Sequence, residues 1–236
     1  MRAGVSMSIA SNIDEIKYRI DCAAKKSGRC GDDINLIAVS KTVDIPLIQE
    51  AVDYGLSDFG ENRPQEIRDK SKVIENVNWH QIGQLQSNKI KYVAGKTKLI
   101  HSVDSLKLME EIEKYCKLHN FTQDILLQVN ISKEASKSGM DIAEIEKMLE
   151  FAEKMECVKV KGLMTIGSLY ADLEENKKYF EICNNLFVDI SRKKYDNISM
   201  EYLSMGMSGD FEAAIEMGSN MVRIGTSIFG KRNYNI

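Results

Sequence analysis

The stretch Ile34-Asn35-Leu36-Ile37-Ala38-Val39-Ser40-Lys41 is the segment from which the fold can be worked out. Its apolar residues do not alternate with polar ones, which is typical of a strand buried on both faces. Ser40 and Lys41 follow directly, so the lysine lies where a buried strand meets a loop. Apolar surroundings lower the pKa of an ammonium and make the neutral amine a usable nucleophile. A lysine that extends its charge into solvent is the alternative at this position.

An apolar strand followed by an amphipathic helix recurs along the rest of the chain. A helix is predicted first, at about 9–28, with four isoleucines on one face: Ile9, Ile13, Ile16 and Ile20. Eight strands are predicted after it, at 34–39, 57–62, 77–83, 98–103, 124–131, 158–166, 199–204 and 220–225. Helices are predicted between them, at 46–52, 64–74, 87–94, 104–119, 141–155, 172–192 and 210–217.

Eight strand–helix repeats predict an all-parallel sheet that is covered by helices. Their number and length match an α/β fold, the (β/α)8 TIM barrel, over about 34–230. No linker or shift in composition indicates a second domain, so residues 1–236 are predicted to form a single domain. An open doubly wound sheet is the alternative. Its first strand is usually followed by a Gly-rich turn, whereas Ser40-Lys41-Thr42 stands here.

The composition argues against several classes of protein. The chain is 43% hydrophobic and 28% charged, with a net charge of −3, so no strong field attracts nucleic acid or an anionic membrane. We expect no membrane helix, because no apolar span is long enough. We also expect no secretory signal, because the first residues lack an apolar region. Met1 and Met7 both remain candidate start residues.

The cysteines and histidines do not predict a metal site. The five cysteines are scattered without a C-x-x-C pair, which fits a reducing compartment and a cytoplasmic protein: Cys22, Cys30, Cys116, Cys157 and Cys183. The three histidines lie far apart, with no pair at i and i+4: His80, His101 and His119. The sequence therefore predicts neither a disulfide framework nor a bound metal.

The carboxyl ends of the predicted strands bring several polar residues to one mouth of the barrel. In barrels of this kind the active site lies at that end. The residues placed there are Ser40, Lys41, Glu61, Asn62, Gly83, His101, Ser102, Asn130, Met164, Thr165, Ser204, Gly225 and Thr226. Lys41 is the only lysine of this set that directly ends an apolar strand.

The last two strand ends predict a phosphate site. Loops after strands seven and eight of such barrels often bind phosphate. Segments 204–209 and 224–227 supply hydroxyls, glycines and backbone N–H groups that suit an anion. Ordinary turns and helix caps are the alternative. A lysine and a phosphate site in one mouth point to pyridoxal phosphate, whose aldehyde forms a Schiff base with a lysine.

Arg223 interrupts an otherwise apolar strand. Arginine does not lose its proton, so an inward-facing arginine needs a partner. A salt bridge to Glu212 or Glu216 is one interpretation. The other is that Arg223 donates to the pyridine nitrogen of the cofactor, which would keep that nitrogen unprotonated and weaken the ring as an electron sink.

Seven segments resemble the pyridoxal phosphate homeostasis proteins, the YggS/PROSC-like family. They follow one another in order at 38–41, 59–66, 79–89, 130–139, 161–164, 204–208 and 221–230. Two positions depart from the family pattern. Arg63-Pro64 replaces an aromatic or aliphatic pair, and Gly209 stands where a polar residue is common.

The resemblance implies a barrel like the N-terminal domain of alanine racemase, with pyridoxal phosphate held as a Schiff base. It also implies the roles of six residues. Lys41 would form the Schiff base, Asn62 would lie beside the ring, Arg223 would face the pyridine nitrogen, and the phosphate would be held by Ser204, Gly225 and Thr226.

The family is regarded as regulatory and without established catalysis, so the resemblance implies a role in intracellular vitamin B6 homeostasis. Transient contact with apo-enzymes that use the cofactor would follow from that role. Racemases take a second base, a tyrosine, from an additional domain of a partner subunit. The chain ends six residues after Gly230, so we expect no such domain, and we expect a monomer.

Three alternatives stay open. The first is a pyridoxal phosphate-dependent amino-acid racemase with Tyr170 as the second base, although a surface loop is the simpler interpretation of that tyrosine. The second is nucleic-acid binding, through a set of lysines that is more typical of a solvated helix and turn: Lys89, Lys91, Lys96 and Lys98. The third is that Lys137 acts as a secondary cofactor site.

Overall fold

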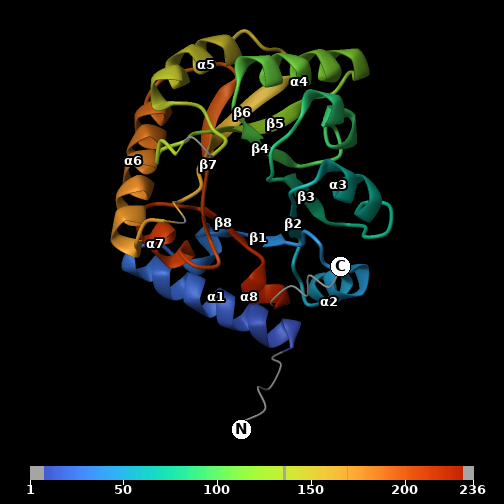
Figure 1. Cartoon of the computed structure of the whole chain (residues 1–236), viewed down its shortest axis with the longest axis vertical. Helices are drawn as coiled ribbons and strands as arrows, with labels where there is room; N and C mark the ends of the chain where they lie inside the picture. Colours follow the sequence, from blue (N-terminus) through green and yellow to red (C-terminus); the bar gives the residue numbers. More distant parts are fainter. Residues whose placement is uncertain (1–7, 135–136, 169, 231–236) are drawn as a thin grey trace.

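The computed structural model describes residues 8–134, 137–168 and 170–230. Its strands form one closed parallel barrel in the order β1 to β8, with β8 beside β1 (Figure 1). They are β1 (Asn35–Val39), β2 (Asp58–Glu61), β3 (Asn78–Gln81), β4 (Leu99–Val103), β5 (Gln123–Gln128), β6 (Val158–Met164), β7 (Ile198–Met207) and β8 (Met221–Ile224). The predicted (β/α)8 barrel is therefore confirmed, and the open sheet is excluded.

Helices cover the outside of the barrel (Figure 1). The α-helices are α1 (Ile9–Lys26), α2 (Ile45–Asp53), α3 (Pro64–Lys70), α4 (Leu106–His119), α5 (Ile145–Ala152), α6 (Leu173–Ser191), α7 (Phe211–Glu216) and α8 (Thr226–Phe229). Short 3-10 helices lie at η1 (Gly31–Asp33), η2 (Ser87–Tyr92) and η3 (Ile142–Glu144). Two predictions need correction: the helix predicted at 64–74 ends at Lys70, and the one predicted at 87–94 is the 3-10 helix η2.

The end of β7 differs most from the prediction. The glycines in 204–209 indicated a loop, but β7 continues to Met207 because its ladder with β8 shifts register and resumes at Met207 and Arg223. Gly206 permits this shift, since its φ of 94° is unfavourable for other residues. Ser204 therefore lies inside a strand, three residues before its end.

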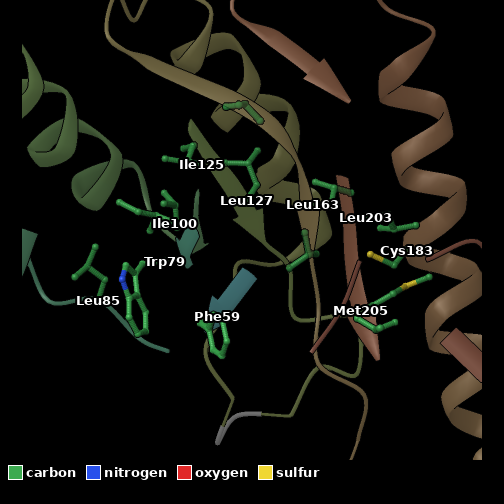
Figure 2. Close-up of a cluster of buried hydrophobic side chains, with 14 of the residues drawn as sticks. Phe59, Trp79, Leu85, Ile100, Ile125, Leu127, Leu163, Cys183, Leu203 and Met205 are labelled. Atoms are coloured by element: carbon green, nitrogen blue, oxygen red, sulfur yellow. The ribbon is translucent and has the colours of Figure 1, made fainter. Parts of the chain in front are cut away.

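Two hydrophobic cores stabilise the barrel. The larger one lies between the strands and the helices, and Figure 2 shows part of it, with Phe59, Trp79, Ile100, Leu127 and Leu163. The smaller one fills part of the barrel interior with Ile37, Leu99, Leu126, Met164 and Met221. Buried polar side chains, among them His80, His101 and Arg223, also lie inside the barrel, so its interior is packed rather than hollow.

Helix α1 packs beside α7 and α8 (Figure 1). Its predicted apolar face is buried. The Asn12 side-chain amide donates to Ile228 O of α8 at 2.8 Å, and the Arg19 guanidinium donates twice to the Glu212 carboxylate of α7, at 3.0 and 2.8 Å. These bonds fix the two short helices that flank the end of β8.

The described residues contain neither a membrane-spanning helix nor a metal-binding cluster. No helix among them is both long and apolar enough to cross a membrane. No group of histidine, cysteine and acidic side chains among them is arranged to hold a metal ion. The five cysteines are all unpaired.

Candidate functional site

A cavity of about 510 Å³ opens at the carboxyl ends of the strands. Its lining comes from seven parts of the barrel mouth: Val39, Lys41, Asn62, Ile82, Gly83, Gln84, Gln128, Lys137, Ser138, Ile166, Met207, Ser208, Gly209, Arg223, Gly225 and Thr226. This set contains three cations, and none of these described lining residues is acidic. The cavity is therefore suited to an anionic ligand.

Five of the six predicted site residues line this cavity: Lys41, Asn62, Arg223, Gly225 and Thr226. Ser204 does not. It is completely buried in β7, below the cavity wall. Ser208, four residues along, lines the cavity instead.

The backbone on both sides of Lys41 is fixed by charged side chains of α3. Lys70 Nζ donates to Ser40 O at 2.8 Å, and Thr42 N donates to Glu66 Oε2 at 3.0 Å. Thr42 has a φ of 60°, an uncommon conformation for threonine that these contacts hold in place. Lys41 itself is half-buried at the cavity wall. The structure thus gives the lysine the predicted place, at the end of a buried strand.

Glu61 lies behind this loop, completely buried between β2 and α3. Its Oε1 accepts from Ser40 Oγ at 2.6 Å and from Lys70 Nζ at 2.8 Å, while its Oε2 has no hydrogen-bond partner among the described residues. Burial raises the pKa of Glu61 to about 7, against the opposing effects of Lys70 and Ser40. Burial also acts to raise the pKa of Glu66, but the hydrogen bonds from Lys70 and from the Thr42 N–H, with the charge of Lys70, together outweigh it and lower the pKa.

A glycine brings Asn62 to the cavity wall. A Cβ atom on Gly83 would lie 2.4 Å from Asn62 O, so the loops after β2 and β3 could not approach each other with any other residue there. The Gln81 amide ties the two loops together by donating to Asn62 O at 3.1 Å and to Gly83 O at 2.8 Å. Ser102 Oγ donates to Gly83 O at 2.6 Å. The position of Asn62 therefore depends on close backbone packing.

The opposite wall is formed by the loop after β7 and the start of α8. Ser208 Oγ accepts from Gly225 N at 3.4 Å, which joins the two segments. The first intrahelical bonds of α8 are donated by Ile228 N and Phe229 N to Gly225 O, at 2.9 Å each. Thr226, the first residue of α8, lines the cavity. This wall is the predicted phosphate site.

Arg223 forms part of the cavity lining and is only 4% exposed. One of its terminal nitrogens donates to Ser204 Oγ at 2.6 Å, and the other donates to Thr165 O at 2.9 Å. Burial lowers the pKa of Arg223 to about 10, and nearby Asp210 opposes this shift. Arg223 therefore stays charged at neutral pH.

The salt bridge considered for Arg223 is not the one that forms. Glu212 pairs with Arg19 at 2.8 Å, and Glu216 pairs with Lys26 at 2.8 Å. Both glutamates lie on α7 and bind cations of α1. The partners of Arg223 are therefore polar groups inside the barrel.

Comparisons with known proteins agree with this geometry. The family model described as "Alanine racemase, N-terminal domain" matches residues 11–233. The pyridoxal phosphate homeostasis protein of Aquifex aeolicus (strain VF5) is 39% identical over 230 residues, which cover 97% of this chain and 100% of that protein.

The chain belongs to the pyridoxal phosphate homeostasis protein family.

Two solved structures place the fold. PipY of Synechococcus elongatus PCC7942, solved with pyridoxal phosphate bound, is 29% identical, with a TM-score of 0.82 over 94% of this chain and 100% of that one. The alanine racemase of Clostridium difficile 630 is 12% identical, with a TM-score of 0.68 over 93% of this chain and 57% of that one. The second likeness concerns the fold alone. The predicted relation of this family to the alanine racemase barrel is confirmed.

Tyr170 and the lysines at 89–98 do not line this cavity. Tyr170, the candidate second base, is 88% exposed and is not part of the cavity lining. Lys89 and Lys91 lie over the Tyr92 ring, at 5.6 and 5.3 Å from its centroid, and Arg68 lies over it at 5.0 Å. These cations stabilise the contact between α3 and η2, and a stacked base would have to displace them.

Lys137, the candidate secondary site, lines the cavity. Its Nζ donates to Glu134 Oε1 at 2.7 Å, to Ser132 Oγ at 3.1 Å and to Gly167 O at 3.1 Å. The sequence did not indicate Gln128 as a site residue, although it ends the buried strand β5 and lines the cavity. A polar residue at the end of an apolar strand was the signal that could have identified it.

Proposed function

We propose that this protein binds pyridoxal 5'-phosphate at the barrel mouth and serves intracellular vitamin B6 homeostasis. The observation that supports this most strongly is that Lys41, Arg223 and the start of α8 line the same cavity. The cofactor has an aldehyde, a pyridine nitrogen and a phosphate, and these are the three groups that a lysine, an arginine and backbone N–H groups can hold. The residues present therefore fit the cofactor.

The proposal assigns each wall of the cavity a role. Lys41 holds the cofactor as a Schiff base, and Asn62 lies beside the ring. Gly225 and Thr226 hold the phosphate, with Ser208 as the hydroxyl that lines the cavity. Bound pyridoxal phosphate supplies a reactive aldehyde and an electron-withdrawing ring.

We propose that Arg223 donates to the pyridine nitrogen. Because Arg223 keeps its charge at neutral pH, the nitrogen beside it stays unprotonated and the ring is a weak electron sink. A weak sink suits holding and releasing the cofactor better than proton abstraction from an amino acid. The exposed position of Tyr170 is consistent with this role, since racemisation needs a base on each face of the substrate.

We further propose that the protein acts as a cytoplasmic monomer that delivers the cofactor to apo-enzymes. The names of its relatives support a homeostatic role. The unpaired cysteines are consistent with a reducing compartment.

The test of the site is reductive trapping. The protein is incubated with pyridoxal phosphate, reduced with borohydride, digested and mapped by mass spectrometry. The pyridoxyl group is expected on Lys41, to be lost in Lys41→Arg and to be retained in the matched control Lys137→Arg. A first adduct on another lysine of the native protein would overturn the assignment.

The test of the non-catalytic role is isotope exchange. The loaded protein is incubated with a panel of L-amino acids in deuterium oxide, and the α-hydrogen is followed by NMR. We expect exchange no faster than with free pyridoxal phosphate. Exchange and D-amino acid formation at enzyme-like rates would make the protein a racemase.

A further inference from the structure

A continuous row of hydrogen-bonded polar side chains crosses the interior of the barrel. It starts at Asp58, at the amino end of β2, and runs through His80 of β3, His101 of β4 and Ser204 of β7 to Arg223 of β8. Asp58 Oδ1 lies 3.0 Å from His80 Nε2, and His80 Nδ1 lies 3.0 Å from His101 Nε2. Ser204 Oγ lies 3.1 Å from His101 Nδ1 and 2.6 Å from a terminal nitrogen of Arg223. Both rings and the serine are completely buried. This interior row links the cavity wall to the opposite end of the barrel.

The two ends of the interior row determine its direction. An arginine only donates, and an ionised carboxylate only accepts. Asp58 therefore accepts from Nε2–H of His80, and a neutral His80 accepts at Nδ1 from Nε2–H of His101. A neutral His101 in turn accepts at Nδ1 from the hydroxyl of Ser204, which accepts from Arg223. With neutral rings and an ionised Asp58, no other order satisfies every group.

The surrounding charges favour this state. Lys98 Nζ lies 3.1 Å from Asp58 Oδ1. Burial acts to raise the pKa of Asp58, but the hydrogen bonds from His80 and Ser57 and the charge of Lys98 together outweigh it, so the pKa lies below its usual value. Burial lowers the pKa of His80, and Lys98 lowers it further although Asp58 opposes both. Burial, His80 and Arg223 all lower the pKa of His101. The row thus joins a cation to an anion through two neutral rings.

We propose that Asp58, His80, His101 and Ser204 are positioning residues that hold Arg223 toward the cavity. Ser204 Oγ fixes one terminal nitrogen of Arg223 and Thr165 O fixes the other, which sets the plane of the guanidinium. The guanidinium has further N–H groups that these two bonds do not use. The inference rests on the proposed function, in which one of these N–H groups donates to the pyridine nitrogen. It assigns Ser204 to the arginine rather than to the phosphate.

The first test measures the two rings directly in the apo-protein. Nitrogen-15 NMR of histidine side chains distinguishes the Nε2–H tautomer, the Nδ1–H tautomer and the charged ring. The chain has only three histidines, so exposed His119 is the reference signal, and His119→Gln confirms its assignment. Both His80 and His101 are expected as neutral Nε2–H tautomers at pH 7. A charged ring, or an Nδ1–H tautomer at either position, would overturn the inference.

The second test separates a contact to arginine from a contact to phosphate. Ser204→Ala is titrated with pyridoxal phosphate and with pyridoxal, which lacks the phosphate. Loss of a hydrogen bond to a charged group should weaken both by about tenfold. A loss confined to pyridoxal phosphate would mean that Ser204 binds the phosphate, and no loss for either would mean that the row does not act on Arg223. Both results contradict the inference.

A matched pair of variants tests the row away from the cavity. In His101→Gln the side-chain amide can still accept from Ser204 and donate to His80, whereas His101→Leu breaks the row. The leucine variant is expected to lose about tenfold in affinity for both aldehydes, and the glutamine variant to stay within about threefold of wild type. Equal losses would show a merely structural role. If wild type binds neither aldehyde, the proposed function fails, while the tautomers of the rings still decide whether the row is ordered as inferred.

Discussion

Replacing Glu61 by Gln should make the protein more stable at neutral and alkaline pH. Glu61 is completely buried, and its Oε2 has no hydrogen-bond partner among the described residues. A glutamine keeps an oxygen that can accept from Ser40 and Lys70 but never ionises. The variant therefore removes the cost of a buried charge while it keeps the shape of the side chain.

The magnitude follows from the pKa of Glu61. Burial raises it from 4.5 to about 7, so the folded protein binds this proton more tightly than the unfolded chain does. That contribution is fully present below the unfolded pKa and is lost as the pH rises through about 7. The loss amounts to about 3 kcal/mol of the free energy of unfolding. The variant keeps its stability over the same interval, because glutamine does not titrate.

Urea unfolding of both apo-proteins between pH 5 and pH 8 provides the measurement. The difference in the free energy of unfolding between Glu61→Gln and wild type should grow by about 2 to 3 kcal/mol in favour of the variant. Glu66→Gln is the matched control, since the pKa of Glu66 is lowered and its stabilising effect is lost only as the pH falls. Parallel curves for Glu61→Gln and wild type would refute the argument.

Two other predictions concern packing and thiol reactivity. Gly83→Ala should lower the free energy of unfolding by about 2 kcal/mol and weaken cofactor binding, because its Cβ would lie 2.4 Å from Asn62 O. The control is Gly209→Ala, whose Cβ meets nothing within 4 Å. Urea unfolding of both variants checks this prediction, and equal stabilities would contradict it. Burial raises the pKa of Cys116 to about 12, so an aromatic disulfide reagent at pH 8 should modify exposed Cys30 first and Cys116 only in denaturant. Peptide mapping of the modified protein checks the order, and early modification of Cys116 in the native state would contradict the buried position.

The order of the strands and most of the cavity lining could be predicted from the sequence. Apolar runs separated by amphipathic segments are local patterns, and a parallel barrel collects the residues that end each run at one mouth. Lys41 and Asn62 lie in the cavity for this reason. Gly225 and Thr226 of the opposite wall could be predicted in the same way, because they directly follow the short buried strand β8.

The place of Ser204 could not be read from local pattern. The glycines after it suggested that the strand ends there, whereas β7 continues through a register shift with β8. Partners such as His101 and Ser204, which are 103 residues apart, meet only because the barrel closes. The pairing of Lys70 with Glu61 likewise depends on how α3 lies against β2. Periodicity predicts which face is buried, but not which polar groups meet on it.

Both charged groups proposed to meet the cofactor are held by buried polar contacts. The loop of Lys41 is fixed from outside the barrel by Lys70, and Arg223 is fixed from inside by Ser204. Groups held beforehand lose little freedom on binding, so more of the contact energy contributes to affinity. The folded protein bears the cost, since the unpartnered oxygen of Glu61 destabilises it by about 1–3 kcal/mol. A ligand that binds only the folded state restores stability. Release of the cofactor should therefore leave a protein with a smaller free energy of unfolding.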